Sequence, residues 1–185
     1  MGMDIHVRIA KYNVETNLYE ELQLFRKRKP NEKEYNYETG EPLPWNDFTE
    51  IHIWLGRNYE MFEGMRNGTA EDGYGYFPWT SVSLSSLESS FAEKIKKKMS
   101  CEGMFDFKEL TLADMYNYIY NHPTVVDYEE KEETWEDWEP GDPVPQKENP
   151  IKSVMEKIKN FISIADEDFD WMPWSYYKII FYFDW

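Results

Sequence analysis

The sequence has little cysteine and no long hydrophobic run, and both shortages exclude classes of protein. Cys101 is the only cysteine among 185 residues, which excludes a disulfide framework and a zinc site built on paired thiolates. The longest strongly apolar run, residues 176–183, has eight residues and contains a lysine, whereas a helix that spans a bilayer needs about 20 apolar residues. The opening residues do not resemble a signal peptide. We therefore expect a soluble, cytoplasmic protein in a reducing compartment, with no membrane partner.

Basic residues are also scarce. The chain has 20 Lys and Arg against 36 Asp and Glu, a net charge of −16, and its sequence pI is about 4.6. Because an acidic surface repels phosphate, we expect no direct binding of nucleic acid and a partner with a basic surface. Hydrophobic residues make up 41% of the chain and aromatic residues 18%, which is enough for a hydrophobic core. At this length we expect a single domain, residues 1–185.

Alternation of apolar and polar residues predicts strands near the N-terminus. Ile5, Val7 and Ile9 alternate with polar residues, which places one face of a strand in the core. Residues 18–25 follow a short polar turn, so the two segments predict a hairpin. The next stretch, residues 26–46, starts with a basic run, contains prolines and has no period, which predicts a long loop.

Two later segments are also expected to be extended. Residues 50–55 alternate again and predict a third strand or the extended entry to a helix. Residues 176–183 are apolar on both faces and rich in strand-forming residues, which predicts a central strand that is covered on both sides.

Helical spacing of apolar residues predicts three or four helices. A short one is expected over residues 58–66. Ser85 and Glu88 have the spacing of a capping box before a second helix, and Thr111 can cap a third. Residues 149–150 are Asn-Pro, a capping residue followed by proline in the first helical position. The sequence therefore predicts an α+β fold: a small, mostly antiparallel sheet with three or four helices and long acidic loops.

Residues 127–149 form an acidic loop in which aromatic residues alternate with carboxylates. The segment has ten acidic and two basic residues, and so carries half of the net charge; such a run is solvated or bound to a partner. A second acidic segment with tryptophans follows at residues 166–174. Aromatic side chains among carboxylates suit an interface with a basic surface, and the alternative is a solubilising loop whose tryptophans fold back onto the core. The candidate partner-binding residues are Glu130, Glu132, Glu133, Trp135, Glu136, Asp137 and Trp138.

Asp4 and His6 are the candidates for a metal site, because they share the polar face of the first predicted strand. If the first and last strands pair, Asp184 would approach Asp4, and Glu50 or His52 could join from a third strand. Oxygen and nitrogen ligands of this kind suit a divalent metal.

A structural role for that strand face is the interpretation that we favour. Asp4 can cap a turn or pair with Arg8 or Arg57, and His6 can be a half-buried, hydrogen-bonded strand residue. The sequence also has no Gly-x-Ser-x-Gly elbow and no phosphate-binding loop that ends in Gly-Lys-Ser/Thr. We therefore expect a binding protein without metal or cofactor, and leave an enzyme as the alternative.

Four short motifs give the chain a family resemblance: Met3-Asp4-Ile5-His6, Gly56-Arg57-Asn58-Tyr59-x-x-Phe62, Leu110-Thr111-Leu112-Ala113-Asp114 and Phe181-Tyr182-Phe183-Asp184. In these motifs the chain resembles a family of small, largely uncharacterised proteins encoded by tailed bacteriophages. The family often has histidines before the Leu-Thr-Leu motif, whereas residues 102–109 contain none. The resemblance implies a phage or prophage origin, where small acidic proteins often inhibit host defence, as anti-CRISPR proteins do.

The leading hypothesis is therefore a phage-encoded inhibitor of a host defence system, acting in the cytoplasm of the bacterial host cell. It would bind a basic nucleic-acid-binding groove of a host protein, such as a CRISPR effector nuclease, through an acidic, aromatic surface. The alternative is a metal-dependent hydrolase or nucleotide-binding protein that uses Asp4, His6 and Asp184. A virion or replication accessory protein is a third hypothesis.

Overall fold

A computed structural model of the chain describes residues 4–36, 39–55, 69–70, 75–76, 78–100, 105–121 and 150–184. Its centre is a six-stranded antiparallel sheet with the order β2-β1-β10-β9-β8, in which β5 pairs with β1 on the same edge as β2. The strands are β1 (Asp4–Asn13), β2 (Leu18–Glu21), β5 (Ile53–Trp54), β8 (Thr80–Ser81), β9 (Phe105–Thr111) and β10 (Tyr177–Asp184). The mostly antiparallel α+β prediction is confirmed.

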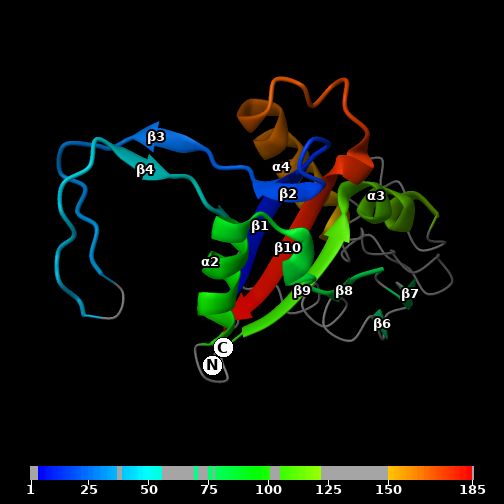
Figure 1. Ribbon diagram of the computed structural model, residues 1–185, viewed down its shortest axis with the longest axis horizontal. Coiled ribbons are helices and arrows are strands. Elements are labelled where there is room, and N and C mark those ends of the chain that lie inside the picture. The colour runs from blue at the N-terminus through cyan, green and yellow to red at the C-terminus, as the bar shows by residue number, and fades with distance from the viewer. Residues whose placement is uncertain are drawn as a thin grey trace, which may run out of the picture.

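Three helices cover the sheet (Figure 1). They are α2 (Ser89–Met99), α3 (Leu112–Asn121) and α4 (Pro150–Ala165), and two short 3₁₀ helices, η1 (Leu84–Ser86) and η3 (Trp174–Tyr176), lead into α2 and β10. Two small ribbons lie outside the sheet: β3 (Phe25–Lys27) with β4 (Phe48–Glu50), and β6 (Thr69–Ala70) with β7 (Gly75–Tyr76). None of the helices in the described part of the chain is long and apolar enough to cross a bilayer.

β10 is the central strand that its sequence predicts, since it lies between β1 and β9. Ile179 and Phe181 belong to the hydrophobic cluster with α3 and α4. Ile180 and Tyr182 point the other way, into the cluster with α2. Because helices cover both faces of the strand, both of its faces are apolar.

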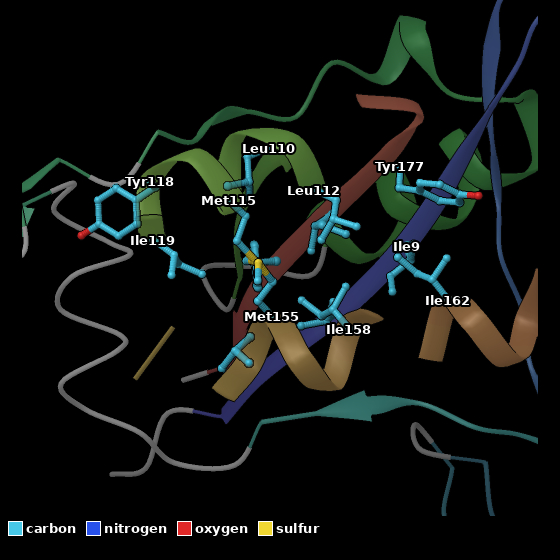
Figure 2. Packing of buried hydrophobic residues seen from close by; sticks show 14 of the residues in the cluster. Ile9, Leu110, Leu112, Met115, Tyr118, Ile119, Met155, Ile158, Ile162 and Tyr177 are labelled. Atoms are coloured by element: carbon cyan, nitrogen blue, oxygen red, sulfur yellow. The ribbon is translucent and has the colours of Figure 1, made fainter. Parts of the chain in front are cut away.

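The larger core lies between the sheet and helices α3 and α4 (Figure 2). β1 buries the alternating residues that the sequence predicts, and each helix buries the side chains of one face. The main contributors are Ile5, Val7 and Ile9 from β1, Leu112, Met115 and Ile119 from α3, and Met155, Ile158 and Ile162 from α4.

Two of the predicted helix starts are confirmed and a third is corrected. The backbone N–H of Asp114 donates to Thr111 Oγ1 at 3.1 Å, and α4 begins at Pro150. At α2, however, the capping residue is Glu88, whose carboxylate accepts from the N–H groups of Ser90 and Phe91. Ser85 lies in η1 instead. The backbone bond from Glu88 N to Tyr19 O, 2.8 Å long, holds the chain at this point, so α2 starts after it.

The predicted strand over residues 18–25 and the predicted loop over residues 26–46 are corrected. β2 ends at Glu21, and the chain then leaves the sheet as a two-stranded arm, residues 22–50, whose base is the β3–β4 pair (Figure 1, blue to cyan). The third predicted strand, residues 50–55, divides into the end of β4 and the short β5. Beyond Leu22, which still packs against the larger core, the arm pairs with itself, so its residues have no regular core face to produce a period.

The α4 helix offers a matched test of the larger core. We expect Ile158→Ala to lower the free energy of unfolding by about 2–5 kcal/mol, because Ile158 is 0% exposed and truncation leaves a cavity. Ile164→Ala on the same helix should change it by less than about 0.5 kcal/mol, since Ile164 is 62% exposed. Urea denaturation of both variants measures the difference, and equal effects would contradict this packing.

Candidate interaction surface

The segment between α4 and η3, residues 166–173, forms a tight loop that we call the Trp171 loop. Asp168 N donates to Asp166 Oδ1 at 3.0 Å, a local side-chain bond typical of aspartate in turns. Phe169 N donates to the carbonyl of Asp166 at 3.2 Å, and Trp171 N donates to that of Asp168 at 2.9 Å. The loop therefore has a defined conformation set by its own hydrogen bonds.

A buried carboxylate fastens the Trp171 loop to the sheet. Asp166 Oδ2 accepts hydrogen bonds from Tyr177 Oη at 2.7 Å and Lys11 Nζ at 2.8 Å. Tyr177 and Lys11 are register partners in the β1–β10 pair. Lys11 Nζ also lies 3.5 Å from Asp168 Oδ2. One carboxylate thus joins the loop to two central strands.

These contacts set the protonation states of the group. Burial alone would raise the pKa of Asp166, but hydrogen bonds from Lys11, Tyr177 and the Asp168 backbone outweigh it and hold the pKa below its usual value. Burial would lower the pKa of Lys11, yet the two aspartates raise it overall. Burial and Asp166 together raise the pKa of Tyr177 far above its usual value. At neutral pH the carboxylate of Asp166 and the amine of Lys11 are charged. Tyr177 keeps its proton and donates a hydrogen bond to Asp166.

Phe169 and Trp174 belong to the core. Phe169 is buried, and its ring lies edge-on to Tyr177 with centroids 5.3 Å apart and parallel to Trp174 at 6.3 Å. Trp174 in turn meets the ring of Tyr116 at 5.0 Å. For Trp174, the alternative in which the tryptophan folds back onto the core is therefore correct.

Trp171 has the opposite environment. It is 85% exposed, more than any other large hydrophobic side chain in the described part of the chain. Glu167, Asp168 and Asp170 around it are exposed as well. An indole in this position adds nothing to the core, and large exposed aromatic groups are typical anchors of protein interfaces.

A cleft of about 440 Å³ lies beside the loop, between Met172 and the β1–β2 hairpin. Glu20 is held in place there, since its Oε1 accepts from Asn13 Nδ2 at 2.8 Å. The cleft and the Trp171 loop together form what we call the acidic-aromatic surface. The cleft is lined by Lys11, Tyr12, Asn13, Val14, Glu15, Glu20, Glu21, Leu22 and Met172.

The structure brings part of the predicted metal site together. β1 and β10 pair, which is the condition that the metal site requires, and Asp4 and Asp184 are register partners. The ring of His6 stacks on that of Tyr182, with centroids 4.8 Å apart and planes at 8°. Among the described residues, no group of three or more His, Cys, Asp or Glu side chains is placed to hold a metal ion.

The third-strand candidates have other partners. Glu50 Oε1 accepts from Arg8 Nη1 at 2.7 Å, and Arg8 Nη1 also donates to Glu21 at 3.0 Å. His52 Nε2 lies 3.8 Å from Glu50 Oε2. Burial and the nearby charge of Arg8 lower the pKa of His52, so the imidazole is neutral at pH 7. Arg8, Glu21 and Glu50 form an ion-pair network on the α2 side of the sheet, and the neutral His52 lies beside it.

The predicted partner-binding residues of the acidic loop, residues 127–149, lie outside the described residues, as do Cys101, Arg57 and the predicted helix over residues 58–66. The Trp171 loop lies in the second acidic segment of the sequence, but the sequence does not reveal the bond between Lys11 and Asp166. The two residues lie far apart in the sequence, so no local pattern connects them.

Comparisons of the chain with protein-family models, curated proteins and solved structures find no match.

The Asp166 group predicts a pH-dependent stability. We expect Asp166→Asn to lower the free energy of unfolding by about 1–3 kcal/mol at pH 7, because buried hydrogen bonds are lost. The carboxylate has a lower pKa folded than unfolded, so its stabilisation is complete above about pH 4 and is lost as the pH falls through the folded value. Denaturation of wild type and variant between pH 7 and pH 2 should show the difference shrinking. Asp170→Asn is the exposed control, and a difference that is constant with pH would contradict the assignment.

The strand face of Asp4 and His6 predicts no metal binding. Thermal melts of chelator-stripped protein should be unchanged by Mn²⁺, Mg²⁺ or Zn²⁺, whereas a ligand at a hundredfold excess over its Kd stabilises a folded protein by about 2.7 kcal/mol. A metal-dependent rise that both Asp4→Asn and His6→Ala abolish would show a shared site and favour the enzyme alternative.

Proposed function

We propose that this protein is a non-enzymatic inhibitor that occupies a basic, nucleic-acid-binding groove of a host protein. As its biological role we propose phage-encoded inhibition of a bacterial defence system, in the manner of an anti-CRISPR protein. The observation that carries the binding proposal is the position of Trp171, which is 85% exposed on the firmly held Trp171 loop. The defence role rests on the family resemblance in the sequence.

The acidic-aromatic surface has the properties that such binding needs. Trp171 supplies a large apolar anchor, and the exposed carboxylates around it attract a basic partner over long range, together with the net charge of −16. The loop is already held by Asp166, so its ordering costs little on binding. A groove that binds nucleic acid presents arginines and lysines, which match these carboxylates.

The acidic loop, residues 127–149, is proposed as a further contact segment on the basis of its composition. Its charge and its two tryptophans repeat the composition of the Trp171 loop. In the proposal, its contacts come from Glu130, Glu132, Glu133, Trp135, Glu136, Asp137 and Trp138.

The second candidate function is a metal-dependent hydrolase or nucleotide-binding protein. It is favoured by one observation, the register that places Asp4 opposite Asp184 with His6 on the same strand. The metal-dependent melts described above separate this candidate from the inhibitor, because an inhibitor binds at stoichiometric amounts without metal.

Replacement of Trp171 tests the proposed surface. We expect Trp171→Ala to keep the wild-type melting temperature and to weaken partner binding by about tenfold or more, as loss of an interface anchor does. Phe169→Ala is the matched control, since loss of this buried ring should lower stability by about 3–5 kcal/mol. Proteins retained from a host lysate on immobilised wild type and variant are quantified by mass spectrometry. The retained proteins should be nucleic-acid-binding proteins. Salt and added DNA should release them from the immobilised protein, because salt screens the charges and DNA competes for the same groove.

Equal retention by wild type and Trp171→Ala would remove the Trp171 loop from the proposal. A further variant in which the five acidic residues of the list above become Gln or Asn, and the two tryptophans Ala, tests the acidic loop separately. Retention that neither variant reduces would contradict the proposed function.

A further inference from the structure

Four charged side chains are buried in the described part of the chain, and one of them lacks adequate partners. Lys178 and Glu109 form an ion pair at 3.1 Å, and Lys178 Nζ also donates to Ser86 Oγ at 2.7 Å. Asp166 has the bonds described above. Arg28, in the projecting arm, is the exception.

The guanidinium of Arg28 is enclosed but poorly hydrogen-bonded. Its side chain is 1% exposed. Nη1 donates to the backbone carbonyl of Asn46 at 3.3 Å, and Nη2 lies 3.9 Å from Glu34 Oε1. Nε is buried and has no hydrogen-bond partner among the described residues. An arginine offers five N–H donors, and burying them without acceptors is costly, so this group is suited to an additional acceptor.

Arg28 lines a hollow in the arm that is otherwise walled mostly by apolar side chains. The hollow has a volume of about 180 Å³. The indole of Trp45 covers the guanidinium, with its ring centroid 4.8 Å from Arg28 Cζ. The outer sides of the hollow are open to solvent, since Trp45 is 57% exposed and Tyr35 is 55% exposed. A ligand reaches Arg28 beside this exposed indole, or by displacing the indole at the cost of its hydrogen bond to Asp47. The remaining walls are Glu32, Lys33, Glu34, Pro42 and Leu43.

The backbone around the hollow is held in place. Leu43 N donates to Glu34 O at 2.8 Å, and Arg28 N donates to Asp47 O at 2.9 Å, so the two sides of the arm are bonded to each other. Trp45 Nε1 donates to Asp47 Oδ1 at 3.1 Å. The site is therefore built into the arm.

The nearby carboxylates are already engaged. Glu34 accepts a hydrogen bond from Thr49 Oγ1, and Arg26 Nη1 donates to Glu32 Oε2 at 2.9 Å. This arginine lowers the pKa of Glu32 to about 2. Neither carboxylate supplies the missing acceptor for Arg28 Nε, and both would repel a doubly charged phosphate.

We propose that the Arg28 hollow binds an acidic peptide segment of a partner protein. The carboxylate of an Asp or Glu side chain would pair with Arg28, and a neighbouring apolar side chain would pack against Trp45 and Tyr35. The hollow is lined by two cations, Arg28 and Lys33, and by the two engaged carboxylates, so a single added negative charge suits the Nε donor of Arg28 that lacks a partner among the described residues. The volume of about 180 Å³ accommodates a side chain and is below the roughly 300 Å³ at which pockets for drug-sized ligands begin, so it suits a side chain better than a nucleotide.

The experiment uses the full chain labelled with ¹⁵N and two short peptides, acetyl-Leu-Glu-Leu-amide and acetyl-Leu-Gln-Leu-amide. The reporter is the indole N–H signal of Trp45, identified by its absence from Trp45→Phe. We expect a saturable shift with the Glu peptide and at least tenfold weaker binding of the Gln peptide. Inorganic phosphate should leave the signal in place.

Two variants place the response at Arg28. Arg28→Gln should abolish the shift, and Lys27→Gln, at an exposed neighbouring cation that does not line the hollow, should preserve it. Because Arg28→Gln could disturb the arm, Tyr35→Ala provides a second test: it removes an exposed wall and should weaken the Glu peptide several-fold without moving the backbone signals of Leu43 and Asp47. Equal binding of both peptides, a response to phosphate alone, no response, or retention of the shift in Arg28→Gln would overturn the proposal.

Discussion

The antiparallel pairing of β1 with β10 positions the rest of this protein. It joins residues close to the two ends of the sequence, from Asp4 opposite Asp184 to Lys11 opposite Tyr177. All three layers are arranged around this pair, because α2 packs on one face of it and α3 and α4 pack on the other. The same register sets Lys11 beside Tyr177, and both bond to Asp166. The presentation of Trp171 thus follows from the register of two strands.

The two faces of the sheet are stabilised in different ways. Helices α3 and α4 cover one face, and the buried residues between them and the sheet are hydrophobic. A single helix covers part of the other, and ion pairs occupy the area beside it: Arg8 bonds to Glu21 and Glu50, and Lys94 bonds to Glu21 at 2.6 Å. Half-buried ion pairs add little net stability. Their effect here is to join β1, β2, β4 and α2 in one arrangement.

The two proposed binding surfaces select for opposite charge. The acidic-aromatic surface presents carboxylates around an exposed indole, and a basic partner satisfies them. The hollow in the arm presents one buried guanidinium between engaged carboxylates, and an acidic side chain satisfies it. A ligand suited to one surface is repelled by the other, so the two sites do not compete.

Local sequence determined the elements whose physical cause is local. The alternation of Ile5, Val7 and Ile9 and the two apolar faces of β10 predict the central strands. The cap at Thr111 and the proline at position 150 predict two helix starts, because burial and capping act over a few residues. Together they also predict the α+β class. The acidic segment around Trp171 is visible in composition alone.

Tertiary structure decided the features that depend on distant partners. Phe169 and Trp171 lie two residues apart with similar character, yet one ring is buried against Tyr177 and Trp174 and the other is exposed. Their loop is held to the sheet by the bonds of Asp166 to Lys11 and Tyr177. Glu88 caps α2 because its backbone is held by Tyr19. The basic run of residues 26–29 reads as a solvated loop, yet Arg28 is enclosed once the arm folds back on itself. Such contacts have no period or spacing in the sequence, since they arise from chain segments that meet only in the folded state.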